Sequence, residues 1–154
     1  MIRLTFPRKT FLTGCGALMA AGPFVARADA SDVAALRRHP SSVASMRVFL
    51  LDPSITTLVA VTPGTLETFK GVRVTTHTDA ASIRTVLDAL AASKAQPGTS
   101  PADVRYGVVF FGAANRRLLS AYADRYGTRG AIDAARVTYG DPGPLIAALK
   151  RASH

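Results

Sequence analysis

RYGVVFFGAANRRLLSAYADRYG, residues 105–127, is the stretch of this sequence that decides the fold. Residues 105–112 are rich in Val and Phe and predict a strand. The part that follows fits two structures. A helix capped by Asn115 would line up large side chains at its own period, namely Leu118, Leu119, Tyr122 and Tyr126. A strand would place alternate residues on one face, namely Leu118, Ser120 and Tyr122.

We favour the strand for residues 116–126, because the loop that joins them to the strand at residues 105–112 is short enough for a β-hairpin. A second turn follows at residues 127–130. Outside this stretch, β-branched and apolar runs separated by turn signals predict four more strands, at residues 46–51, 55–61, 72–76 and 131–139. Short connections between neighbouring strands favour antiparallel pairing.

Residues 79–93 give the clearest helix. Their apolar side chains recur at the helical period, namely Ile83, Val86, Leu87, Leu90 and Ala91. Thr78 or Asp79 can cap the helix, because a short polar side chain accepts from the free amides there. A final helix is predicted after Asp141, with Asp141 as its cap and a proline in its first turn. One helical turn is predicted within residues 62–71.

Together these elements predict an α+β fold, a mostly antiparallel sheet of about five strands packed against one long and one C-terminal helix. The loop at residues 95–101 is too short for a domain linker, so residues 46–154 form a single domain. Residues 31–45 precede it as a leader or a short helix.

Residues 1–30 have the three parts of a secretory signal peptide. Basic residues come first, an apolar run follows at residues 11–26, and small residues before a cleavage site end it at Ala28-Asp29-Ala30. The run is interrupted by glycines and Pro23 and is shorter than the roughly 20 residues of a membrane span. Cleavage after Ala30 predicts an exported protein, periplasmic or extracellular, with no membrane span.

Two shorter patterns inside this segment concern the route of export. Arg8-Lys9-Thr10-Phe11-Leu12 resembles the twin-arginine signal, although Lys9 stands where that family has a second Arg, so the Sec route stays open. Leu12-Thr13-Gly14-Cys15 resembles the lipobox of bacterial lipoproteins. The apolar stretch before Cys15 is too short for a lipobox signal, so Cys15 is expected to leave with the signal peptide rather than become a lipid anchor.

The composition of residues 31–154 excludes several kinds of chemistry. Cys15 is the only cysteine, so the mature chain has no disulfide, thiol nucleophile or thiolate metal site. Removing four basic residues and one acidic residue lowers the formal net charge from +9 to +6. Most of the remaining cations are Arg, which binds carboxylate and phosphate bidentately, so acidic partners are expected. The charges are scattered, whereas a nucleic-acid-binding protein has a denser stripe.

Motifs for catalysis, metals and cofactors are sparse. The three histidines, His39, His77 and His154, lie far apart in the sequence and predict no metal site. No nucleophile elbow or phosphate-binding loop occurs, and no cofactor is predicted. His77 and Asp79 are the candidate acid-base pair, with Asp52 as a third member of a small hydrolase site. The competing interpretation is that Asp79 serves as a helix cap.

The densest polar and aromatic region supplies the candidate binding residues, namely Arg116, Arg117, Tyr122, Arg125, Tyr126, Arg129 and Arg136. Tyr and Arg dominate binding hot spots because each buries a large area and keeps a polar end. The sequence therefore predicts a small non-enzymatic binding protein with a protein partner in the cell envelope. Its architecture is similar to that of inhibitor and immunity proteins. A polyanion-binding envelope protein is the alternative, followed by a small hydrolase that uses His77.

Overall fold

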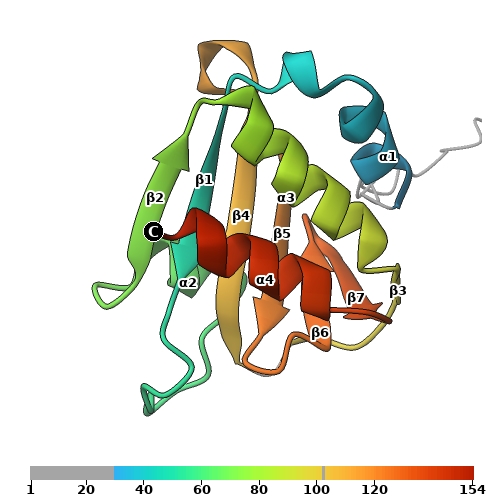
Figure 1. Cartoon of the computed structure of the whole chain (residues 1–154). Helices are drawn as coiled ribbons and strands as arrows, with labels where there is room; N and C mark the ends of the chain where they lie inside the picture. Colours follow the sequence, from blue (N-terminus) through green and yellow to red (C-terminus); the bar gives the residue numbers. More distant parts are fainter. Residues whose placement is uncertain (1–29, 102) are drawn as a thin grey trace, which may run out of the picture.

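The computed structural model describes residues 30–101 and 103–154, which form one antiparallel sheet with helices packed on it (Figure 1). Seven strands in these residues follow the order β2-β1-β4-β5-β6-β7-β3. They are β1 (Ser45–Leu50), β2 (Arg73–His77), β3 (Ala95–Pro97), β4 (Val104–Phe111), β5 (Arg117–Asp124), β6 (Arg129–Ile132) and β7 (Ala135–Tyr139). The predicted α+β class and antiparallel pairing are confirmed, with seven strands where about five were expected.

The described residues contain four α-helices, namely α1 (Ala30–Arg38), α2 (Pro63–Thr68), α3 (Ala80–Ala92) and α4 (Gly143–Ala152). α3 and α4 cross one face of the sheet, whereas the short α2 lies on the opposite face (Figure 1). Two single 3-10 turns, η1 (Pro40–Ser42) and η2 (Ala113–Asn115), connect elements. Within the described residues, no helix has both the length and the apolarity that crossing a membrane requires.

The β4–β5 hairpin is the centre of the sheet and confirms the strand prediction for residues 116–126. η2 closes the hairpin, and Val108 pairs with Ala121 while Gly107 pairs with Tyr122. β4 is buried almost throughout, on both of its faces. Its Val-rich and Phe-rich sequence therefore needs a strand on each side to satisfy its backbone groups, and β1 and β5 provide them.

The larger hydrophobic core lies between the sheet and the α3–α4 layer. The predicted stripe of α3 faces it, since Ile83, Val86, Leu87 and Leu90 are buried. The Asp79 carboxylate accepts a hydrogen bond from the Ser82 amide (2.7 Å), which confirms the predicted cap. In α4 the N-cap is Pro142 and no side chain caps the helix, so the prediction of Asp141 as its cap is wrong.

A smaller core lies under α2 on the opposite face. Leu66 of α2 packs there with apolar residues of the sheet, namely Phe49, Val109, Tyr122 and Ala131. Thr62 caps α2 by accepting from the Thr65 amide (3.2 Å), and Pro63 occupies the first turn. The helical turn predicted for residues 62–71 is therefore present, as Pro63–Thr68.

Two strand predictions are wrong. Residues 55–61 form a loop between β1 and α2, because β2 and β4 already occupy both edges of β1. Residues 131–139 divide into β6 and β7, since Asp133 adopts a positive φ of 47° and reverses the chain. A third difference is β3, which forms in the predicted loop and pairs with β7. Residues 1–29, and with them Cys15, lie outside the described residues.

Candidate functional site

The face of the sheet opposite α3 and α4 carries four of the seven predicted binding residues. Tyr122 pairs with Ala131 and Ala131 pairs with Arg136, so Tyr122 and Arg136 lie in one row across β5, β6 and β7. Arg129 precedes Ala131 by two residues and Arg117 pairs with Phe111, which places both on this face. We call Arg117, Arg129 and Arg136 the arginine face.

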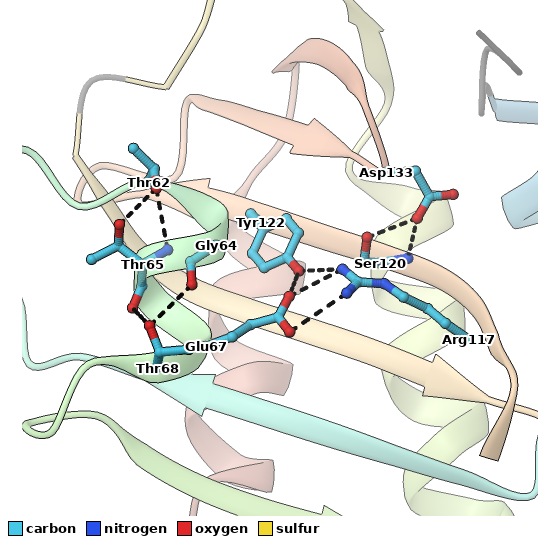
Figure 2. A network of polar contacts seen from close by, with 9 residues as sticks. All are labelled: Thr62, Gly64, Thr65, Glu67, Thr68, Arg117, Ser120, Tyr122 and Asp133. Atoms are coloured by element: carbon cyan, nitrogen blue, oxygen red, sulfur yellow. Dashed lines mark hydrogen bonds and ion pairs between the residues drawn. The ribbon is translucent and has the colours of Figure 1, made fainter.

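A polar cluster holds one edge of the arginine face in place, where α2 meets β5 (Figure 2). Arg117 Nη2 donates to Glu67 Oε1 (3.1 Å) and also to the Tyr122 hydroxyl. The Tyr122 hydroxyl donates in turn to Glu67. Tyr122 is buried, whereas the Arg117 side chain is about half exposed. The cluster therefore fixes the Arg117 guanidinium and leaves part of it open to a partner.

Electrostatics set the protonation states in this cluster. Burial, and then the hydrogen bond to Glu67, raises the pKa of Tyr122 well above its ordinary value. Burial by itself would lower the pKa of Arg117, but Tyr122 and Glu67 outweigh it and raise the pKa. Tyr122 therefore stays a neutral hydrogen-bond donor and Arg117 stays a cation. This arrangement suits the binding of an anion better than proton abstraction by Tyr122.

The buried tyrosines predict that the protein loses stability in alkali. Burial also raises the pKa of Tyr139, whose hydroxyl donates to the Tyr122 carbonyl oxygen (2.9 Å). Below the unfolded-state pKa of about 10, both tyrosines are neutral in the folded and unfolded states. Above that pH only the unfolded state releases these protons. Each tyrosine therefore lowers the free energy of unfolding by about 1.4 kcal/mol for every unit by which the pH rises.

Urea unfolding measured between neutral pH and alkali checks this expectation. Tyr122→Phe and Tyr139→Phe should each flatten the fall in the free energy of unfolding. Tyr126 is 76% exposed, so Tyr126→Phe is the matched control, which removes a hydroxyl that folding does not bury. Equal slopes in all three variants and the wild type would show that the two buried hydroxyls do not cause the loss.

Asp103, just before β4, holds two arginines at one end of the sheet. Asp103 Oδ2 accepts from Nε and Nη2 of Arg105, at 2.9 and 2.6 Å. Arg105 is only 1% exposed, and its Nη1 has no hydrogen-bond partner among the described residues. Arg125 Nε lies 3.8 Å from the same carboxylate oxygen. This pair was not among the predicted site residues, although an Asp and an Arg two residues apart at a strand start are a signal for it.

The remaining predicted binding residues lie at the two ends of β5. Arg116 is exposed just before β5, after η2. Arg125 and Tyr126 lie beyond the other end of the strand, in the turn to β6. The Tyr122 ring is buried, so it is not open to a partner, and its hydroxyl is part of the Glu67 cluster. The seven predicted binding residues thus lie on one face of the sheet and at the two ends of β5.

His77 ends β2 on the side of the sheet that faces α3 and α4. Its Nε2 donates to the Ala152 carbonyl oxygen at the end of α4 (2.6 Å), and its Nδ1 lies 3.7 Å from Asp79 Oδ2. Hydrogen bonds from Ser82 lower the pKa of the Asp79 carboxyl. A depression of about 270 Å³ lies beside His77, between residues of α3 and α4 such as Thr85 and Arg151.

Asp52 lies far from this histidine. Leu50 pairs with Arg73 at the start of β2, whereas Met46 pairs with His77 at its end, so the antiparallel register separates Asp52 from His77 by the length of the strand. The structure therefore brings His77 and Asp79 together but leaves Asp52 out. Asp52 instead accepts from the Ser54 amide (2.8 Å), which lowers the pKa of its carboxyl. In residues 30–101 and 103–154, no group of three His, Cys, Asp or Glu side chains is placed to hold a metal ion.

Comparison with known proteins finds no family model, no curated protein and no solved structure that matches this chain. The arginine face and the residues that support it are therefore the features that indicate a function.

Proposed function

We propose that the protein is an exported binding protein of the cell envelope, similar in kind to inhibitor and immunity proteins, which holds an acidic protein partner on its arginine face. The observation that carries this proposal is the state of Arg129 and Arg136. Both are exposed on the open side of β6 and β7, and neither has a carboxylate within 4.0 Å in the described part of the chain.

The surroundings of these two arginines support binding to a flat acidic surface. Ala131, paired with Arg136, is small, and Thr138 pairs with Arg129. Short side chains between the guanidinium groups allow a partner to approach the sheet closely. Each guanidinium can then meet a carboxylate with two parallel hydrogen bonds, which is the strong geometry for such pairs. Arg117 adds a third cation whose position the Glu67 cluster fixes.

Export is the second part of the proposal and rests on the signal-peptide pattern of residues 1–30. Cleavage after Ala30 would leave every strand and the α2, α3 and α4 helices complete, since Ala30 is only the first residue of α1. The released domain would be held together by its two hydrophobic cores, because the sole cysteine lies in the removed segment.

A capture experiment tests the proposed function. Tagged chain incubated with an envelope extract of the native cell should retain a protein through washes in high salt. With that protein purified, Arg129→Ala/Arg136→Ala should weaken binding by at least about tenfold, since each desolvated bidentate pair contributes strongly. Arg38→Ala/Arg151→Ala is the matched control, because these arginines lie on helices of the other face and should leave the affinity unchanged.

Binding to a polyanion is the second candidate, favoured by the formal charge of +6 for residues 31–154. It predicts that only polymer is retained, that affinity falls steeply with salt, and that both double variants weaken binding to the same extent. That result would contradict the proposed function. A partner that binds both variants as tightly as the wild type would also contradict it, by moving the contact away from the arginine face.

A further inference from the structure

The exposed apolar side chains of the described residues gather at one end of the sheet. All six large ones lie in three segments there: Ile55, Leu58 and Val59 in the loop after β1, Phe69 and Val74 around the start of β2, and Tyr126 in the turn after β5. Leu50 pairs with Arg73 and Val104 pairs with Asp124, so the antiparallel register brings these segments to the same end. We call residues 52–61, 69–74 and 125–129 the apolar end, and its loop between β1 and α2 reaches lowest in Figure 1.

The loop at residues 52–61 is anchored at its base and free at its tip. The Leu51 amide donates to the Arg105 carbonyl oxygen (2.9 Å), and the Val104 amide donates to the Val61 carbonyl oxygen (2.8 Å). Arg105 Nη2 also reaches Thr57 Oγ1 (3.3 Å). Beyond these contacts Leu58 is fully exposed, and Val59 is 72% exposed. The hydrogen-bonded base of this loop thus carries two aliphatic side chains that are mostly or fully exposed.

The segments that carry these apolar side chains are also basic. The apolar end contains four basic residues, Lys70, Arg73, Arg125 and Arg129, against the single acidic residue Asp52. The charges of Arg105 and Asp103 at its base offset each other. Apolar tips flanked by Lys, Arg and an exposed Tyr are the composition of a surface that enters the headgroup region of a bilayer. The positive charge fits the negative surface of anionic lipids.

We propose that the apolar end docks on an anionic phospholipid bilayer, with Leu58 and Val59 entering the acyl boundary and Lys70 and Arg73 meeting headgroup phosphates. This second binding surface shares only Arg129 with the arginine face and would present the rest of that face beside the membrane. Shallow insertion is compatible with the helices of the described chain, since side chains at a loop tip enter without a spanning segment.

The features of this end favour a bilayer over a protein partner. A protein interface core excludes charge and packs apolar groups into a contiguous patch. Here the apolar side chains stand on three separate segments that also carry cations, and Leu58 is fully exposed. A fluid lipid surface accommodates separated tips, because acyl chains move around each of them and headgroups meet each cation.

Single tryptophans provide the test, because the chain contains none. Full-length Leu58→Trp is mixed with vesicles of phosphatidylglycerol and, separately, of phosphatidylcholine. Its fluorescence emission should shift to the blue with the phosphatidylglycerol vesicles and not with the phosphatidylcholine vesicles. Thr78→Trp is the matched control, since Thr78 is exposed beyond the far end of β2, and its emission should stay unchanged. The N-terminal apolar run is the same in both proteins and cannot produce a difference between them.

Charge reversal gives the second measurement. Lys70→Glu/Arg73→Glu in the Leu58→Trp protein should weaken vesicle binding by at least about tenfold, since each cation near an anionic surface contributes on the order of fivefold. Arg38→Glu/Arg151→Glu, on α1 and α4, should weaken it less. Three results would overturn the proposal: no shift of the residue 58 emission, an equal shift from residue 78, or a shift caused by an envelope protein and not by vesicles.

Discussion

Asp103→Ala is expected to lower the free energy of unfolding by about 3 kcal/mol. Arg105 is 1% exposed, and Asp103 supplies the carboxylate that pairs with its guanidinium at 2.6 Å. Without this carboxylate the folded state keeps a buried cation with no partner, which is far more costly than the loss of a surface pair. The Asp103 side chain is 26% exposed, so we place the loss at the low end of the range for buried pairs. Urea unfolding at neutral pH measures it.

Two further variants separate the buried charge from other causes. Replacing both partners, as Asp103→Ala/Arg105→Met, removes the unpaired cation and should restore most of the lost stability. Asp88→Ala breaks the exposed Arg37–Asp88 pair, whose atoms are just as close at 2.6 Å, and should cost less than about 1 kcal/mol. If the double variant is no more stable than Asp103→Ala, the charge of Arg105 is not responsible.

Gly130→Ala is expected to be at least as damaging, with a loss of about 3 kcal/mol or more in the free energy of unfolding. A Cβ at this position would overlap the backbone carbonyl oxygen of Tyr122 and the ring of Tyr139. Tyr139 is itself held by its hydrogen bond to that carbonyl oxygen, so neither neighbour can move without separating β5 from β6. Thermal unfolding and near-ultraviolet circular dichroism measure the loss of packing.

Gly64→Ala is the matched control for this substitution. Gly64 lies in α2, and a Cβ there would meet no other atom within 4 Å. Alanine in a helix is more favourable than glycine by up to about 1 kcal/mol, so this variant should be equal to or more stable than the wild type. Equal losses from Gly64→Ala and Gly130→Ala would mean that the crowding at Gly130 has no part in the effect.

The parts of the fold that were predictable from the sequence are those with a strong local pattern. The stripe of α3 and its Asp79 cap follow from spacing and residue type alone. The β4–β5 hairpin was predictable because a buried Val-rich and Phe-rich strand needs neighbours. The strand predicted at residues 55–61 failed for a global reason. Its composition favours a strand, but no edge of β1 was free to pair with it.

The candidate site, like the fold, was predictable from the sequence only in part. Sequence placed Arg117, Arg129 and Arg136 in one region. Alternation along β6 and β7 puts Arg129 and Arg136 on one face, whereas Arg117 reaches it only through a register shift between β4 and β5 that the sequence does not reveal. Glu67 was missed as a site residue, because its partner Arg117 lies 50 residues away and only the packing of α2 on the sheet joins them. Asp52 was grouped with His77 although the two lie at opposite ends of β2, since the register of β1 and β2 cannot be read from composition.

The strand order has a consequence for the kinetics of folding. β4, β5, β6 and β7 are neighbours both in the chain and in the sheet, so this meander closes only short loops as it forms. β3 precedes β4 in the chain but joins the far edge, where Ala95 meets Tyr139, after α3 has carried the chain across the sheet (Figure 1). The three residues of β3 therefore have no strand partner until β7 has formed. This pairing between residues distant in the chain raises the contact order and is expected to slow the completion of the sheet.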